Sequence, residues 1–296
     1  EARLLENRLR VLTGVRFEQT DDRGHGPLFD PNGAFQRDSA GRLLRVNNAF
    51  VRRPEAGAAG SLQELPFIRR ERGATSSRTY DGYYPSLHLT YDIRENFLAR
   101  AAYARTYGRP NFSDIIPLTT INEADLNEVQ LADPSVIKGT LTVRNTALRP
   151  WTANNYDFSL EYYTNQGGLI SASIFLKEIK DFFGSSVRLA TLADLTAADL
   201  DPRYVGWNLS TKFNAGDATI KGADCNLRQS LRALGRWGGY FTVFANATKL
   251  LLAGSSQASF TSFIPKSGNW GVSFNRQQIT LTTRWNYRGL DKRAAI

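Results

Sequence analysis

The order of the connections constrains this fold more than any single motif, because long and short connections alternate along the chain. Apolar and polar side chains alternate with a period of two, which is typical of strands. This pattern predicts strands over 8–20, 84–92, 97–107, 153–164, 168–181, 217–231, 239–250, 269–275 and 279–288. The short connections fall around 93–96, 165–167, 232–238 and 276–278, and the long ones cover about 21–83, 108–152, 182–216 and 251–268. Such a meander has short turns at one end and long loops at the other, as transmembrane β-barrels do. Long structureless loops are uncommon inside compact soluble domains.

The hairpin predicted over 153–181 shows two different faces. A three-residue turn at 165–167, with glycine in the left-handed conformation, would pair Phe158 with Ile174 and Leu160 with Ala172. This register makes one face continuously apolar and the other continuously polar. The last predicted strand repeats the pattern. The side chains that we expect to face lipid are Tyr156, Phe158, Leu160, Tyr162, Ile170, Ile174, Leu176, Leu281 and Trp285.

Polar side chains on the opposite face are expected to point into a lumen. They are His88, Asp92, Asp157, Glu161, Lys177 and Arg284. Two roles are open for them: hydrogen bonds with one another, with water or with a plug, and direct contact with a transported ligand. Arg109, in an outer loop, could contact lipid phosphate or substrate, or could stabilise the exit of a strand. Aromatic residues gather at the strand ends, which predicts interfacial girdles.

Composition excludes several classes of protein. The mean hydropathy is −0.36, and no apolar run approaches the ~20 residues that a membrane helix needs. The net charge of +9 comes mainly from arginine and fits either nucleic acid or phosphate-bearing lipid. No basic run or RNA-binding motif concentrates that charge, so we expect no nucleic-acid partner. The chain has no methionine and is expected to be an internal piece of a longer protein.

No catalytic, metal or cofactor site is predicted. The single cysteine, Cys225, lies on an apolar strand face, where an inert role is expected, and the two histidines are far apart in sequence. Asp30 and Asn32 lack the further acidic ligands of a calcium loop, and no G-x-S-x-G elbow is present. In the long loops, turn sequences at 30–33 and 38–41 predict a small flanked hairpin. Thr196 and Asp199 have the spacing of a capping box, which predicts a short helix over 196–200 that ends before Pro202.

Four segments resemble the C-terminal part of the barrel of TonB-dependent outer-membrane receptors. They are "YYPSLHLTYDIRENFLARAAYARTYGRPNFSDIIP" (83–117), "NTALRPWTANNYDFSLEYYTNQGGLISASIFLKEIKDFF" (145–183), "NAGDATIKGADCNLRQSL" (214–231) and "FIPKSGNWGVSF … WNYRG" (263–289). The resemblance implies an all-β, antiparallel up-and-down barrel of about 22 strands, of which this chain would supply about nine or ten. The family's TonB box, plug domain and aromatic-ended last strand have no counterpart here.

The resemblance further implies a protein of the bacterial outer membrane that is not an enzyme. It would import a scarce nutrient such as an iron–siderophore complex, a cobalamin-like cofactor or an oligosaccharide. Its expected partners are outer-membrane lipid and lipopolysaccharide, the ligand, and the TonB energy-coupling complex acting through the missing plug. The alternatives are a passive porin-like channel, a barrel enzyme and a soluble carbohydrate-binding β-sandwich.

Overall fold

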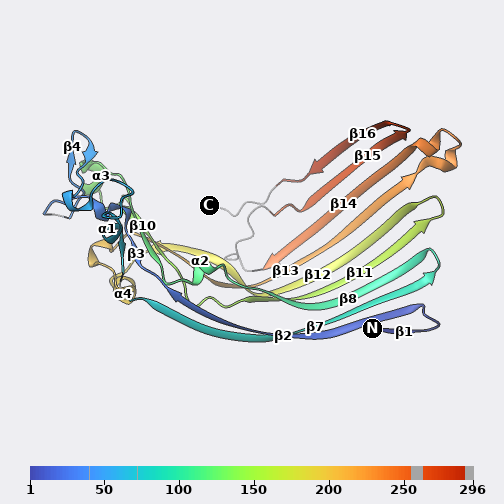
Figure 1. The fold of residues 1–296 in the computed structure, drawn as a ribbon, viewed down its shortest axis with the longest axis horizontal. Helices are drawn as coiled ribbons and strands as arrows, with labels where there is room; N and C mark the ends of the chain where they lie inside the picture. Colours follow the sequence, from blue (N-terminus) through green and yellow to red (C-terminus); the bar gives the residue numbers. More distant parts are fainter. Residues whose placement is uncertain (40, 72, 255–262, 291–296) are drawn as a thin grey trace.

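One large curved sheet forms most of the computed structural model, which describes residues 1–39, 41–71, 73–254 and 263–290 (Figure 1). We call its long antiparallel part the wall. In spatial order the wall strands are β1 (Ala2–Leu4), β2 (Leu9–His25), β7 (Thr75–Arg94), β8 (Phe97–Gly108), β11 (Trp151–Thr164), β12 (Gly168–Leu189), β13 (Asn208–Ser230), β14 (Phe241–Gly254), β15 (Lys266–Arg276) and β16 (Ile279–Arg288). The predicted antiparallel, all-β meander is therefore confirmed. Among the described residues β1 and β16 do not pair with each other, so the barrel is not closed.

The short turns lie at one end of the wall and three of the long loops at the other, as the alternation predicted (Figure 1). The fourth long loop, predicted over about 251–268, lies largely outside the described residues. The predicted turn at 165–167 joins Thr164 to Gly168, with Gly167 at a φ of +74°. One short turn was missed. It joins β1 to β2, and Leu5, Glu6 and Asn7 all have positive φ there. Nothing in the short β1 segment alternates long enough to predict a strand.

Several wall strands are longer than predicted. β7 begins at Thr75 instead of 84, β12 continues to Leu189 instead of 181, and β13 begins at Asn208 instead of 217. In these extensions main-chain pairing continues, while the alternation that marks an apolar face stops. A bulge between Ile179 and Phe182 divides the two parts of β12. Side-chain periodicity reports which face of a strand is apolar, so it could not reveal strand segments whose apolar and polar side chains do not alternate.

Beyond the wall, the described parts of 26–74, 109–150 and 190–207 pack together, and we call them the loop cap. The first residues of β13 pair in parallel with β10 (Gly139–Val143), and the sheet continues through β9 (Thr119–Glu123), β3 (Leu28–Phe29) and β6 (Arg69–Arg70). The hydrophobic core of the loop cap comprises Leu28, Ile121, Leu141, Ala190, Leu195, Leu200, Tyr204, Trp207 and Leu209. The long loops are therefore folded structure with a core of their own.

Short elements complete the loop cap. They are α1 (Leu65–Ile68), α2 (Phe112–Ile115), α3 (Glu128–Ala132), α4 (Leu192–Ala197), the strands β4 (Arg45–Val46) and β5 (Ala49–Phe50), and three 3-10 turns, η1 (Pro31–Ala34), η2 (Pro54–Ala56) and η3 (Pro202–Tyr204). At the other end of the wall, η4 (Leu231–Leu234) and η5 (Gly238–Tyr240) join β13 to β14. Within the described parts of the chain, no helix has the length and apolarity to span a membrane.

Two local predictions for the loops were wrong. The helix near Pro202 begins one turn earlier than predicted, because Thr191 and Asp194 form the capping box, whereas Asp199 has a positive φ of 52°. Both pairs have the same spacing, and the packing of Leu195 in the core and the ion pair of Arg188 with Asp194 favour the first. The loop hairpin β4–β5 follows both predicted turn sequences, and it turns at Asn47 and Asn48 instead of being flanked by them.

Candidate functional site

The register of the wall places all six predicted polar-face residues on one face and all nine predicted lipid-facing residues on the other. Tyr156 is opposite Tyr103 and Leu176, and Trp285 is opposite Trp270. Directly opposed residues share a face of a sheet. The apolar rows therefore continue from strand to strand across the wall, and Cys225 lies among them, opposite Ala172.

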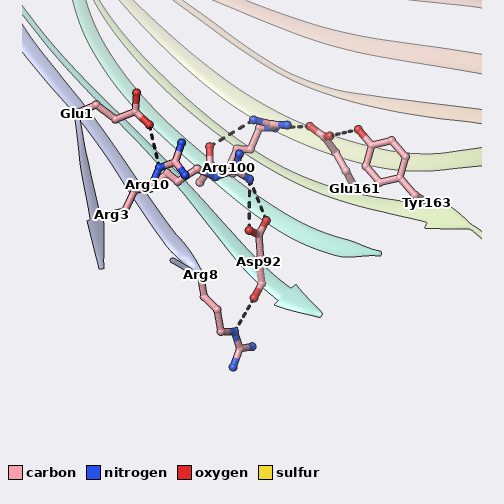
Figure 2. A network of polar contacts seen from close by, with 9 residues as sticks. Glu1, Arg3, Arg8, Arg10, Asp92, Arg100, Glu161 and Tyr163 are labelled. Carbon is pink, nitrogen blue, oxygen red and sulfur yellow. Dashed lines mark hydrogen bonds and ion pairs between the residues drawn. The ribbon is translucent and has the colours of Figure 1, made fainter. Parts of the chain in front are cut away.

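A network of charged side chains crosses four wall strands on the polar face, near the short turns (Figure 2). Arg10 bonds to both carboxylate oxygens of Asp92, at 3.1 and 3.3 Å. The Nε of Arg100 donates to Glu161 at 2.8 Å. Tyr163 donates its hydroxyl to the other oxygen of Glu161 at 2.9 Å. The structure thus pairs each of the predicted residues Asp92 and Glu161 with its own arginine, and Arg100 also donates to the hydroxyl of Thr90 on β7 at 3.3 Å.

Strand register explains this arrangement, because it creates a basic row next to an acidic one. One row of directly opposed residues runs across β2, β7, β8 and β11 and contains, in that order, Arg10, Thr90, Arg100 and Ser159. The adjacent row, one step nearer to the short turns, contains Asp92 and Glu161. It continues through Ser171, Asn226, Asn246, Asn269 and Asn286. Each carboxylate therefore meets a guanidinium on a neighbouring strand.

The four other predicted residues lie outside this network. Lys177 places its Nζ 5.4 Å from the ring centre of Trp151, and the guanidinium of Arg284 lies 5.6 Å from that of Phe244. His88 and Asp157 share a row on either side of Ala102. The network residues that were missed are Arg10, Arg100 and Tyr163. The alternation of Arg10 and Arg100 with apolar neighbours is the signal that identifies them.

Arg109 lies just after the end of β8 and contacts β2. Its guanidinium donates to Glu18 at 3.0 Å and to the hydroxyl of Tyr107 at 2.6 Å. Tyr107 itself bonds to Glu18 and stacks on Tyr84, with ring centres 4.5 Å apart. Through these contacts Arg109 connects the end of β8 to β2, which fits a structural role at the exit of the strand.

The loop cap contains a charged pocket of about 290 Å³ that sequence patterns did not reveal. Four basic side chains line it, with Glu123 and two aromatic rings: Arg37, Arg42, Lys138, Arg203, Tyr204 and Trp207. Three of the cations have acidic partners: Arg37 is 2.7 Å from Glu123, Arg42 is 2.7 Å from Asp38, and Arg203 is 3.8 Å from Asp201. The guanidinium of Arg203 lies over Tyr204, 4.7 Å from the ring centre. Its residues come from the three long loops that the structure describes, so only tertiary structure assembles it.

Burial changes the pKa values of groups near this pocket. Burial raises the pKa of Asp30, although a hydrogen bond from the Asn32 amide and the charges of Arg37 and Arg203 oppose the shift. Burial would lower the pKa of Arg37, but its hydrogen bonds to Glu123 outweigh this and raise it. Arg37 therefore remains charged. Lys138 is exposed, and no ion pair joins it to any residue the structure describes.

Other charged groups in the loop cap are structural. Asp114 is buried and bonds to Arg144 at 3.2 Å and to Lys212 at 2.7 Å, which joins α2 to β13. Such a buried carboxylate needs paired charges. Over the described ranges, no three His, Cys, Asp or Glu side chains come together as a metal site would require.

Comparison with known proteins identifies a family. Residues 2–294 match the protein-family model described as TonB dependent receptor-like, beta-barrel. No curated protein sequence is a significant match. One similar solved structure is a variant of the ferric enterobactin receptor PfeA from Pseudomonas aeruginosa, with a TM-score of 0.54 and 15% sequence identity. A second is the copper transporter OprC, with a TM-score of 0.53 and 12% identity. A third is a double mutant of the hemophore receptor HasR from Serratia marcescens in complex with HasA and heme, with a TM-score of 0.50 and 11% identity. The matches cover 96%, 94% and 96% of this chain but only 39%, 33% and 41% of those chains.

Proposed function

The chain belongs to the TonB-dependent receptor β-barrel family, and we propose that the full-length protein imports a scarce nutrient across the bacterial outer membrane. In this proposal the chain supplies wall strands and outer loops, and the import involves binding and gating without bond chemistry. The observation that carries the proposal is the two-faced wall, with the three long loops that the structure describes gathered at one end around a charged pocket.

The apolar face of the wall is proposed to contact lipid. Large side chains on it are far more exposed than a soluble protein tolerates over so wide an area: Ile174 is 60% exposed and Leu281 is 64% exposed. In a soluble β-sandwich, such faces would pack against each other. Within the described structure the wall is one layer, and no second sheet covers this face. Lipid is the cover that this geometry fits.

The polar face is then proposed to line the lumen. Arg10, Asp92, Arg100 and Glu161 satisfy one another's charges there, which supports a structural role for this network, while His88 and Asp157 are placed to contact water or a plug. In this proposal a plug elsewhere in the full-length protein would fill the lumen and contact TonB. A passive porin-like channel is the second candidate, and dependence on cellular energy distinguishes the two.

The loop-cap pocket is proposed as a contact site for the nutrient. Its cations outnumber its acidic side chains, and its rings offer flat apolar surface, so it favours an anionic ligand with planar groups. Of the candidate nutrients, an iron–siderophore complex fits best, ahead of a cobalamin-like cofactor or an oligosaccharide. Lys138 is central to this argument because its charge is not used within the described structure.

The test is uptake by cells that carry the full-length protein in an otherwise receptor-free strain, with and without TonB. Ferric catecholate, ferric hydroxamate, heme and cobalamin are supplied in turn. We expect TonB-dependent growth on one of them, and a several-fold higher half-saturating concentration in Lys138→Glu. The matched control is Lys180→Glu on the outer part of β12. TonB-independent entry of all four would establish a passive channel, and recovery in the aqueous fraction would overturn the membrane assignment.

A further inference from the structure

Three lysines interrupt the apolar face of the wall at its end nearest the loop cap. Lys249 is directly opposite Lys266 on the neighbouring strand, and Lys221 is opposite Leu251. Because Lys249 is also opposite Ala223, two residues from Lys221, the lysines form a contiguous group across β13, β14 and β15. We call them the lysine row. All three side chains are exposed.

The lysine row lacks acidic partners. Its members make no ion pair or side-chain hydrogen bond with the residues that the structure describes. Two like charges directly opposite each other in a sheet are destabilising, and the nearby opposed side chains Ala223 and Leu251 carry no charge. An anion from outside this sheet that lies between the lysines would relieve this repulsion.

An apolar groove adjoins the lysine row on the same face. Its volume is about 500 Å³, and it lies over β11, β12, β13 and β14. Its apolar lining includes Tyr156, Phe158, Ile174, Leu176, Ala223 and Leu251, and Lys221 and Lys249 belong to its rim. A hollow with an apolar floor and cations at one side is complementary to an amphiphile with a chain and an anionic head.

We propose that the lysine row binds the phosphate of a membrane lipid whose acyl chain lies in this groove. The inference rests on the proposed lipid-facing role of the apolar face, and it adds a specific lipid site to it. The position of the lysine row along the wall is consistent with this site, because the lysines lie on the loop-cap side of the apolar band, where lipid headgroups begin. Lysine ammonium groups bind phosphate as point charges, and the closely opposed pair Lys249 and Lys266 makes the strongest part of the site.

Snorkelling is the alternative explanation, because any lysine near a headgroup region extends its charge toward water. The two explanations predict different things. Independent snorkelling lysines would bind no lipid preferentially, and each could be replaced without consequence for lipid retention. A site would retain phosphorylated lipid selectively and would lose it when the charges are removed.

The experiment uses the full-length protein in detergent, incubated with a lipid A-type diphosphoryl glycolipid or with its dephosphorylated form, and native mass spectrometry measures the retained lipid. We expect the wild type to retain the phosphorylated form selectively. The double variant Lys249→Gln and Lys266→Gln should reduce this retention about tenfold, which corresponds to ~1.4 kcal/mol. Replacing both lysines by arginine should preserve it, and Lys138→Gln is the matched charge control in the loop cap.

Equal retention by the wild type and the double glutamine variant would overturn the proposal, as would equal binding of both forms of the lipid. Heat-modifiable mobility in gels checks that each barrel is folded, and the single variant Lys221→Gln provides the comparison if the double variant does not fold. Nutrient uptake separates this inference from the proposed function. The lysine-row variants should lose lipid with uptake unchanged, whereas Lys138→Glu should impair uptake with lipid retained.

Discussion

At the scale of single residues, the carboxylates of this protein differ in the partners that compensate their charge. Asp92 and Glu161 each meet an arginine from a neighbouring strand. Asp30 is buried in the loop cap, and a main-chain amide is its direct hydrogen-bond partner, at 3.0 Å. A paired carboxylate is stable when charged, whereas a buried one with weaker compensation favours its neutral form.

The ion pair of Arg100 and Glu161 should stabilise the wall by a modest amount. Glu161 is largely buried, with 17% of its side chain exposed, while Arg100 is 47% exposed, so solvent screens part of the attraction. We expect a coupling free energy of about 1 kcal/mol. A double-mutant cycle with Arg100→Gln and Glu161→Gln, measured by urea unfolding in lipid vesicles, tests this. Ser171→Ala, opposite Glu161, is the control, and a coupling near zero would contradict the prediction.

Asp30 should make the loop cap less stable as the pH rises. Its folded pKa is raised above the usual value of 3.8 by burial, so protonation favours the folded state. The contribution of Asp30 to the stability of the loop cap is complete below its unfolded pKa, and it is lost as the pH rises through its folded pKa. We expect Asp30→Asn, which keeps an oxygen acceptor for the Asn32 amide, to remove this dependence and to stabilise the loop cap at neutral pH.

Amide exchange over 28–35, corrected for the intrinsic pH effect, measures this change. Asp133 provides a control of opposite sign, because hydrogen bonds from Ser135 lower its pKa. Its contribution is present above the unfolded pKa and is lost as the pH falls through the folded pKa. If Asp30→Asn and the wild type respond identically to pH, the argument from burial fails.

At the scale of elements, local patterns specify secondary structure only where tertiary packing agrees with them. α4 illustrates this point, because two overlapping segments carry the same capping-box spacing. The observed helix uses Thr191 and Asp194, and so directs Leu195 into the core. The hydrogen bonds of Arg188 and Thr191 to Asp194 hold the pKa of that carboxyl well below its usual range.

Removing the observed cap should weaken α4, whereas removing the predicted one should not. Thr191→Ala deletes the side-chain acceptor for the Asp194 amide and should cost about 1 kcal/mol of local stability. Thr196→Ala removes only a hydroxyl that bonds back to Leu192 within the helix. Amide exchange in 192–200 compares the two variants. A larger effect of Thr196→Ala would show that the helix begins where the spacing alone predicted.

At the scale of the whole molecule, the register joins separate strands into one two-faced wall. Each hairpin by itself has two faces, but the pairing of every strand with the next makes the apolar rows continuous from β2 to β16. The described long loops lie together at one end of the wall (Figure 1), where they share one hydrophobic core and line the pocket.

Adjacent residues of β13 should therefore differ in their access to water. Cys225 lies on the apolar face and Asp224 on the polar face. In the full-length protein in lipid vesicles, with any other cysteines replaced, a charged maleimide should leave Cys225 unmodified. It should react with a cysteine introduced by Asp224→Cys in a Cys225→Ala background. In detergent-free denaturant both should react, which controls for reactivity. Preferential labelling of Cys225 would reverse the assignment of the two faces.

Much of this protein follows from its sequence alone. The period of two, the NQG turn and the alternating connection lengths predicted the nine long strands, their order and the register of the 153–181 hairpin. These features are local: a strand that is buried on one face must alternate, and a tight turn sets the pairing beside it. The same alternation places His88, Asp92, Asp157, Glu161, Lys177 and Arg284 on one face.

Tertiary structure decided what local patterns do not encode. The extensions of β7, β12 and β13 are held by main-chain hydrogen bonds, which leave no periodic signature in the side chains. The choice between two capping boxes depended on the core around Leu195. The loop-cap pocket and the lysine row each combine residues from several elements, and their members are distant in sequence. Sequence thus determined the alternation within each strand, and the pairing between strands decided which charges meet.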